Sequence, residues 1–340
     1  MKRLLTVSLL LMLAIGYTSA QPGSDTLILY FAGDVMQHKA QLDAAFNQES
    51  GTYSYAGCLD ALYPEIREAD IAVCNLETTL GGAPYSGYPA FCSPDALASA
   101  LKEAGFDICL TANNHCLDRG ARGLQRTLDV LDTLGLYHLG TYRDPQERES
   151  HHPYIISWRQ HKIALLNYTY DTNGITVNPP SVVNYIDTTQ IASDIKLAKA
   201  LHADCIIACM HWGTEYRMAP DQSQKAMERW LYGHGVSHII GGHPHVVQPV
   251  EERKTKGHAE PGLMTRADST DVHLTVWSLG NYLSNMSAKN TDHGLAVTLY
   301  FVNDKSGLRL ARYRLHPNRT LRHESFRVVP DEAAQDSRHQ

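Results

Sequence analysis

The sequence contains little phenylalanine and none of the motifs that mark several large enzyme classes. It has 6 Phe among 340 residues, against 18 His. There is no GxSxG, GxxxxGK[ST] or HExxH, and no GxGxxG after the first predicted strand, so serine hydrolases, P-loop proteins, zincins and Rossmann dehydrogenases each lack their central element. No CxxC occurs either, which excludes a zinc ribbon. The excess of histidine therefore needs another explanation.

The sequence also lacks an excess of positive charge. It has 30 Lys and Arg against 36 Asp and Glu, a formal net charge of −6. Nucleic-acid binding requires clustered basic residues, so nucleic acid is not an expected partner. With 43% hydrophobic and 19% charged residues, the composition is that of a globular protein and excludes disorder, collagen-like repeats and coiled coil.

Long hydrophobic runs are absent after residue 20. Lys2 and Arg3 precede a largely apolar run at 4–17, and small residues follow it at 18–20. This pattern predicts a signal peptide over 1–20, cleaved after Ala20, with a retained signal anchor as the alternative. We therefore expect a protein exported to the periplasm, the cell envelope or the medium, with no stable transmembrane anchor after cleavage.

Seven cysteines occur in a chain that is expected to be exported. Four lie in apolar runs, which favours buried thiols over disulfides: Cys74, Cys109, Cys205 and Cys209. Cys58 and Cys92 lie nearer loop signals and could pair with each other. An odd total leaves at least one free thiol.

Strand and helix patterns alternate along most of the chain. Runs rich in β-branched and aromatic residues predict buried strands at 26–33, 71–75, 107–111, 205–210, 237–241 and 273–278. Amphipathic patterns predict helices at 58–69, 95–105, 122–135, 191–202 and 222–235, several of which close on Gly. This alternation predicts an α/β fold with a partly parallel sheet.

Two stretches break the alternation, at 154–170 and 294–315. Both have the pattern of antiparallel hairpins, so a second sheet with antiparallel C-terminal strands is expected. No internal repeat or long linker divides the chain. We expect one domain over 21–330, followed by a disordered polar tail at 331–340.

Polar side chains of the metal-ligand type follow the end of each predicted strand. In chain order they are Asp34, Asn75, Glu77, Asn113, Asn114, His115, His211, His243, His245 and Asn281. Ligands bind at the carboxyl ends of strands in α/β sheets. Carboxylate, amide and imidazole groups suit Zn, Mn or Fe, and together they can hold two ions about 3.5–4 Å apart.

Single motifs in this set have simpler interpretations. Asp34 could belong only to a turn, and the NNH sequence at 113–115 could be a hydrogen-bonded loop. Cys116 could be a nucleophile, but it has no identifiable orienting partner. His243 and His245 flank Pro244, so in an extended segment their side chains would emerge on one side and face one ion or a pair. The metal-site interpretation rests on the whole set.

Six motifs, taken in order, resemble a known family. They are FAGDVM (31–36), NLE (75–77), YPAFCSPDALASALKEAGFDICLTANNHCLDRGARGL (88–124), HWGTEY (211–216), GGHPHVVQP (241–249) and SLGNY (278–282). Over roughly residues 27–285 the chain resembles the CapA family of poly-γ-glutamate capsule biosynthesis proteins, whose fold is similar to that of calcineurin-like metallophosphoesterases.

The resemblance implies a four-layer αββα sandwich with mixed sheets and a site for two divalent metal ions. It implies Asp34 as a carboxylate ligand, Glu77 as the bridging carboxylate and Asn114 as an amide ligand. The imidazole ligands would be His211, His243 and His245. His115 would be the general acid, oriented by Asp118, and Glu215 would support the site or contact substrate.

One position departs from the metallophosphoesterase pattern. Met36 stands where these enzymes usually have a second histidine, and a thioether is a poor ligand for a hard ion. One metal position is therefore expected to be weak, unless His38 replaces the missing imidazole.

Three functions agree with these features. The first is a metal-dependent hydrolase that acts on an anionic polymer such as poly-γ-glutamate. The second is a non-catalytic component that binds the polymer within the capsule synthesis machinery. The third is a true phosphoesterase, because family membership does not fix activity.

Overall fold

The fold is built from two large sheets that face each other. A computed structural model of the chain describes residues 18–19, 25–256, 270–305, 307–323 and 325–333. The predicted signal peptide therefore lies, apart from Thr18 and Ser19, outside the described residues. Among the helices of the described ranges, none is both long and apolar enough to span a bilayer.

Sheet A has a mostly parallel centre and antiparallel pairs towards its edges. Its strand order is β1 (Thr18–Ser19), β9 (Tyr154–Trp158), β10 (His161–Thr169), β12 (Cys205–His211), β13 (His238–Gly242), β15 (Thr270–Val276) and β14 (Val250–Lys256). β10, β12, β13 and β15 are parallel, whereas β9 pairs antiparallel with β10 and β14 pairs antiparallel with β15; β1 pairs parallel with β9. The hairpin predicted at 154–170 is the β9–β10 pair.

Sheet B is also mixed. Its strand order is β19 (Arg327–Pro330), β18 (Gly307–Leu321), β17 (His293–Asp304), β2 (Thr26–Val35), β5 (Ile71–Leu76), β6 (Ile108–Leu110) and β7 (Tyr137–Leu139). The short strand β16 (Asn281–Leu283) also pairs with β2. The predicted C-terminal hairpin is the antiparallel β17–β18 pair. Two small pairs complete the strands: β3 (Phe46–Asn47) with β4 (Thr52–Tyr53), and β8 (Thr141–Tyr142) with β11 (Val182–Val183).

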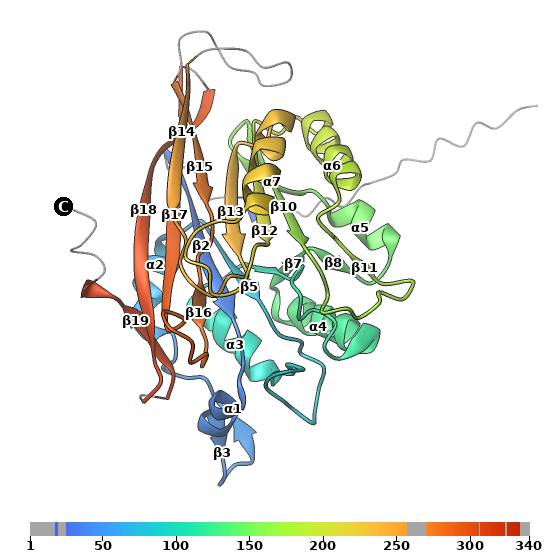
Figure 1. The fold of residues 1–340 in the computed structure, drawn as a ribbon, viewed down its shortest axis with the longest axis vertical. Helices are drawn as coiled ribbons and strands as arrows, with labels where there is room; N and C mark the ends of the chain where they lie inside the picture. Colours follow the sequence, from blue (N-terminus) through green and yellow to red (C-terminus); the bar gives the residue numbers. More distant parts are fainter. Residues whose placement is uncertain (1–17, 20–24, 257–269, 306, 324, 334–340) are drawn as a thin grey trace, which may run out of the picture.

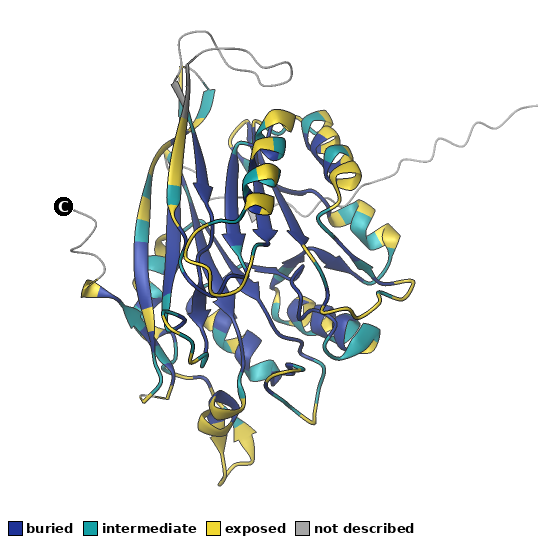
Figure 2. Ribbon diagram, in the orientation of Figure 1, coloured by how far each residue is buried: buried dark blue, intermediate teal, exposed yellow. Residues whose placement is uncertain are grey.

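Alternation along the strands creates the layers. In β2, Leu29 and Phe31 face the core between the two sheets, whereas Tyr30 and Ala32 face a second core on the outer side. The outer core of sheet B is completed by α2 (Tyr63–Glu68), α3 (Asp95–Ala104) and α4 (Gly120–Leu134). The outer core of sheet A is completed by α6 (Thr188–Ala200) and α7 (Gln222–His234). The predicted four-layer αββα sandwich is confirmed (Figures 1 and 2).

The predicted helices are present, with corrections at their ends. α3, α4 and α7 each end before a Gly in the left-handed conformation: Gly105, Gly135 and Gly235. The helix predicted at 58–69 is wrong in length. A 3-10 turn, Asp60–Leu62, precedes α2, and Pro64 lies in the first turn of α2, where proline is tolerated because its missing N–H is not needed. The short helices α1 (Lys39–Ala45) and α5 (Pro145–His151) were not predicted.

Two further expectations concern the cysteines and the C-terminal tail. All seven cysteines belong to the described residues and are free thiols, so the possible Cys58–Cys92 pair is not formed.

At the start of the predicted tail, Asp331 is 9% exposed, and its Oδ2 lies 2.8 Å from His293 Nδ1. The folded part therefore extends at least to Asp331, and residues 334–340 lie outside the described ranges.

Candidate metal centre

The predicted ligands meet where strands of both sheets end. Asp34 is near the end of β2, Glu77 directly follows β5 and Asn114 follows β6, all in sheet B. In sheet A, His211 ends β12, and the segment with His243 and His245 follows β13. All six side chains are buried, with at most 2% of each residue exposed. Elements far apart in the sequence thus supply one compact polar cluster.

Glu77 lies at the centre of this cluster. It belongs to two groups of potential metal ligands, one with Asp34 and His211 and the other with His243 and His245. Within each group the donor atoms lie within 4.8 Å of one another. Glu77 Oε1 is 3.5 Å from His211 Nε2 and 3.7 Å from His245 Nε2. This placement suits a carboxylate that bridges two ions.

Two of the predicted ligands have buried polar atoms that make no hydrogen bond within the described part of the chain, and this bears on whether the cluster fits metal ions. Glu77 is fully buried, yet neither carboxylate oxygen has a hydrogen-bond partner among the described residues, and His243 Nδ1 has none either. A buried carboxylate without a partner costs several kcal/mol. Divalent cations would supply that partner, so the residues present fit the metal pair that the family resemblance implies.

At Asp34 and His243, the electrostatics of the cluster favour the protonation state that binds a metal ion. Burial alone would raise the pKa of Asp34, but the hydrogen bond with His245 and the charge of His211 hold it below its usual range. Burial and the neighbouring His211 and His245 lower the pKa of His243 well below its usual value. An ionised carboxylate and a neutral imidazole are the forms that bind metal.

His245 differs from His243 because two carboxylates surround it. Burial would lower its pKa, but the charges of Glu77 and Asp34 raise it to about 9. Its Nδ1 lies 3.0 Å from Asn281 Oδ1 and 3.4 Å from Asp34 Oδ2. A metal ion at Nε2 therefore competes with a proton at this position.

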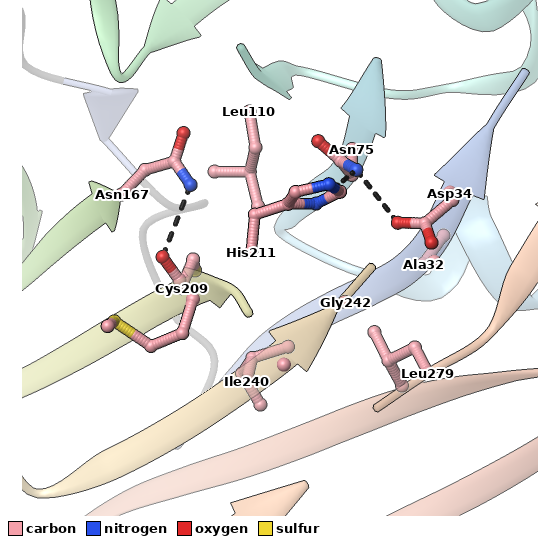
Figure 3. Close-up of a pocket in the computed structure, with 13 residues that line it drawn as sticks. Ala32, Asp34, Asn75, Leu110, Asn167, Cys209, His211, Ile240, Gly242 and Leu279 are labelled. Atoms are coloured by element: carbon pink, nitrogen blue, oxygen red, sulfur yellow. Dashed lines mark hydrogen bonds between the residues drawn. The ribbon is translucent and has the colours of Figure 1, made fainter. Parts of the chain in front are cut away.

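Asparagines hold several of the ligands in place. Asn75 Nδ2 donates a hydrogen bond to Asp34 Oδ1 at 2.8 Å (Figure 3). Asn113 in turn donates to Asn75 Oδ1 at 3.2 Å, and Asn281 contacts His245 as described above. Partners of this kind orient ligands and tune their basicity. The sequence places these asparagines at strand ends but does not reveal which ligand each one supports.

His115 and Asp118 form the pair that the resemblance implies. His115 Nδ1 lies 2.7 Å from Asp118 Oδ2, which also accepts a hydrogen bond from the Phe91 backbone N–H at 2.6 Å. The Phe91 ring packs edge-on against His115, with ring centroids 4.6 Å apart. Asn173, which the sequence does not indicate, accepts a hydrogen bond from Asn114 Nδ2 at 3.2 Å, and its Nδ2 lies 3.4 Å from His115 Nδ1. The loop at 171–174 has no sequence signal that points to this role.

Met36 and His38 occupy the region where one ligand of the usual phosphoesterase set is missing. Met36 is 1% exposed, and its Sδ lies 3.9 Å from Ser284 Oγ. His38 Nδ1 accepts a long hydrogen bond, 3.4 Å, from the backbone N–H of Asn285, and His38 belongs to neither ligand group. His38 Nδ1 also lies 3.2 Å from Gln41 Oε1, and replacement of the missing imidazole by His38 stays a prediction.

The segment with His243 and His245 is not extended, so that prediction is wrong. His243 has φ of 95° and His245 has φ of 58°, both in the left-handed region. Gly241 and Gly242 end β13, and the chain then bends so that both rings enter the cluster, 5.8 Å apart. Such conformations cost about 1–3 kcal/mol each and are typical of functional sites. The backbone N–H of Tyr216 donates to Pro244 O at 2.8 Å and ties the next loop to this bend.

Glu215 lies at the outer side of the cluster. Its side chain is 41% exposed, and its Oε1 is 4.0 Å from His245 Nε2. On the inner side, a cavity of about 20 Å³ is lined by Asp34, Asn75 and His211 together with core residues such as Leu110 (Figure 3). That volume holds about one water molecule. Glu215 therefore lies on the side of the cluster that solvent reaches.

Comparison with known families identifies one that matches most of the chain. Residues 28–286 match the family described as "Bacterial capsule synthesis protein PGA_cap". The range agrees closely with the extent of the motifs found in the sequence.

Two curated relatives carry related names. The chain is 27% identical over 168 residues to "Capsule biosynthesis protein CapA" of Bacillus anthracis, which covers 46% of this chain and 38% of that protein. It is 31% identical over 158 residues to "PGA biosynthesis protein CapA" of Bacillus subtilis (strain 168), which covers 44% of this chain and 40% of that protein. The matched part thus spans about two fifths of each relative.

Among solved structures, the NAD nucleotidase of Haemophilus influenzae is similar. The similarity covers 92% of this chain and 61% of that one, with a TM-score of 0.51 and 14% sequence identity. At this identity the comparison establishes a shared fold.

Proposed function

The chain belongs to the bacterial capsule synthesis protein PGA_cap family, and from this premise we propose that it is an exported, metal-dependent hydrolase of the cell envelope. Its substrate would be an anionic polymer of the polyglutamate type, and the bond that it cleaves would be an amide of that polymer. The names of the Bacillus relatives, which refer to capsule and PGA biosynthesis, support this choice of substrate.

One observation carries the proposal. Glu77 is a fully buried carboxylate without a hydrogen-bond partner among the described residues, and both groups of potential ligands share it. A purely structural cluster would give such a carboxylate hydrogen-bond donors, because buried polar side chains are normally hydrogen-bonded. A pair of divalent ions would be held by Asp34, Glu77, Asn114, His211, His243 and His245.

The ions, when bound, would polarise the scissile carbonyl and lower the pKa of a water molecule. The chain's own residues then have separate tasks. Asp118 accepts the hydrogen bond from His115 Nδ1, which leaves His115 Nε2 to give a proton to the leaving nitrogen. Water adds to the carbonyl carbon, the C–N bond breaks, and the products are a carboxylate and an amine.

A second candidate is a component that binds the polymer without cleaving it. Met36 favours this alternative, because the family resemblance implies a histidine ligand at this position and the chain has a buried thioether there. A single, weakly held ion could position an anionic chain but would activate water less well. The fold shared with a nucleotidase does not favour phosphoester substrates, since one fold supports many chemistries.

Metal content and turnover of purified variants test the proposal. We expect one to two Mn or Zn ions per wild-type chain, and loss of both metal and hydrolysis of poly-γ-glutamate in the double variant His243→Ala, His245→Ala. His115→Ala should keep its metal but lose about 10²–10⁴-fold in rate, as expected for a general acid. His151→Ala, an exposed histidine in α5, is the matched control. A folded wild-type protein that takes up no metal would refute the metal site.

Metal-loaded protein that binds the polymer without cleaving it would favour the second candidate. Cleavage of simple phosphodiesters in place of the polymer would instead identify a phosphoesterase. Both outcomes leave the metal centre in place and reject the proposed reaction.

A further inference from the structure

Exposed aromatic side chains gather at the outer side of the metal centre. Three tyrosines with large exposed fractions lie in loops beside it: Tyr170 at 43%, Tyr216 at 46% and Tyr88 at 76%. Tyr170 directly follows β10, and Tyr216 lies in the loop after β12. Exposed rings that share one site commonly mark a binding surface.

Tyr170 packs directly on the predicted ligands. Its ring centroid is 4.4 Å from that of His243 and 6.4 Å from that of His211, and it is nearly parallel to the His211 ring, at 16°. The ring therefore lies against the ligand cluster while 43% of the residue remains exposed. A group attached to a substrate at the metal centre would contact this ring.

Tyr216 and Glu215 lie on the His245 side of the cluster. The Tyr216 ring centroid is 6.4 Å from that of His245. Tyr216 has φ of 63°, a strained conformation that its hydrogen bond to Pro244 O helps to hold. Burial and the negative charge of Glu215 raise the pKa of Tyr170 and of Tyr216 to about 12. Glu215 directly precedes Tyr216 in this loop, and its negative charge acts on both tyrosines.

Glu215 has no Lys or Arg partner in the described part of the chain. Its only ion-pair contact there is His245, at 4.0 Å, and the exposed Arg217 two residues later makes no ion pair with it. A half-exposed carboxylate beside two tyrosine rings attracts a cation, by charge and by cation–π interaction. The same surface disfavours a residue that carries only negative charge, as every residue of a polyglutamate chain does except the amino-terminal one, whose α-carboxylate is accompanied by an ammonium group.

We propose that Glu215, Tyr170 and Tyr216 bind a primary ammonium group of the substrate. In a γ-linked glutamate polymer the only free α-ammonium lies at the amino-terminal end. The inference rests on the proposed hydrolase function and makes the enzyme exo-acting, so that it removes residues from that end.

The dimensions of the polymer agree with this placement. Four bonds of about 1.5 Å separate the terminal α-nitrogen from the first γ-carbonyl carbon. Glu215 Oε1 is 4.0 Å from His245 Nε2. A carbonyl at the ligand cluster therefore leaves the terminal ammonium within reach of Glu215.

Binding of two matched oligomers tests the inference independently of turnover. The probes are penta-γ-glutamate with a free amino terminus and the same peptide with an acetylated one, titrated by calorimetry into full-length protein with Mn²⁺. We expect the free-amine peptide to bind the wild type at least about tenfold more tightly, and Glu215→Gln to abolish this preference. Glu149→Gln, an exposed carboxylate in α5, should retain it, and Tyr170→Leu should weaken binding of the free-amine peptide.

Equal affinity of the two peptides for the wild type would overturn the inference. Cleavage of both at equal kcat/KM would likewise overturn it while leaving the proposed hydrolase intact. If neither peptide is cleaved but the free amine is still preferred in a Glu215-dependent way, the ammonium site stands and the hydrolase proposal fails. Glu215→Gln should bind the acetylated peptide as tightly as the wild type does, which would show that its loss of preference is not a folding defect of this loop.

Discussion

Histidine has two different tasks inside this protein. Besides the cluster at the metal centre, His238 in β13 is 3% exposed and accepts a hydrogen bond at Nδ1 from the backbone N–H of Leu274, at 3.2 Å. Burial, with a smaller effect of His273, lowers the pKa of His238 to about 3. A neutral imidazole is the only form that can accept this hydrogen bond, so the β13–β15 pairing depends on an uncharged His238.

This dependence predicts a specific loss of stability in acid. Between about pH 6.5 and pH 3 the unfolded chain protonates His238 but the folded protein does not. This residue therefore lowers the free energy of unfolding by about 1.4 kcal/mol for each pH unit of acidification. His238→Asn keeps an acceptor at the same position without a titrating group. We expect urea unfolding of this variant to vary less steeply with pH than that of the wild type.

The exposed His151 supplies the control for that measurement. His151→Asn removes an exposed histidine outside the β13–β15 pairing and should have the same pH dependence as the wild type. An unchanged slope in His238→Asn would show that another group causes the acid sensitivity.

The sequence indicates which residues lie together at the site when each of them directly follows a predicted strand. Asp34, Glu77 and His211 follow buried strands, and the strand-end rule brings such residues together. The same rule covers Tyr170, which directly follows the predicted hairpin at 154–170, but an aromatic residue at that point has no ligand chemistry to single it out. Asn173 lies in an irregular loop, and its contacts with Asn114 and His115 depend on tertiary packing.

At the scale of secondary structure, the close approach of two strands positions part of the site. A Cβ atom at Gly33 in β2 would lie 2.1 Å from the carbonyl oxygen of Gly280, which accepts a hydrogen bond from the Asp34 backbone N–H at 3.0 Å. β16 then pairs Asn281 with Asp34. Because Gly33 has no side chain, its backbone can lie against that of Gly280. This close approach positions Asp34, a predicted ligand, and Asn281, which contacts His245.

Gly33→Ala should disturb stability and metal binding together. The added methyl group meets backbone, which cannot move aside as a flexible side chain can, so we expect a loss of about 1–3 kcal/mol in the free energy of unfolding. Displacement of Asp34 and Asn281 should also weaken Mn²⁺ affinity, measured by calorimetry. Gly233→Ala in α7 is the control, because its Cβ would meet nothing within 4 Å. It should be neutral or up to about 1 kcal/mol stabilising. Equal effects of the two variants would contradict this explanation.

The elements that the sequence does not predict are those with weak local patterns. α1 and α5 have seven residues each, too few for a clear amphipathic repeat. β16 has three residues and is defined by its pairing with β2, which lies about 250 positions earlier in the chain. The bend at 243–245 depends on the backbone geometry of the neighbouring glycines and proline. It also depends on the packing of both histidine rings into one cluster, and no local sequence pattern encodes that packing.

At the scale of the whole molecule, the candidate metal centre connects the two sheets. Asp34, Glu77 and Asn114 follow strands of sheet B, whereas His211, His243 and His245 come from sheet A. The apolar core between the sheets, which includes Leu29, Val73 and Ile207, ends at this cluster. The sequence predicts two sheets and a metal site, but not that the site lies where the sheets meet, because strand order in each sheet depends on non-local pairing.

Metal binding should therefore stabilise the folded protein as a unit. Ions that bind the folded state alone add about 2.7 kcal/mol when their free concentration is 100 times the dissociation constant, which for a chain of this length raises Tm by about 4 °C. We expect Mn²⁺ to produce this shift in calorimetry and to slow amide hydrogen exchange in β5 of sheet B and β12 of sheet A alike. Glu77→Gln should lose the Mn²⁺-dependent shift, because it removes the carboxylate that both groups of potential ligands share. Slower exchange in one sheet alone would show that the ion does not connect the two.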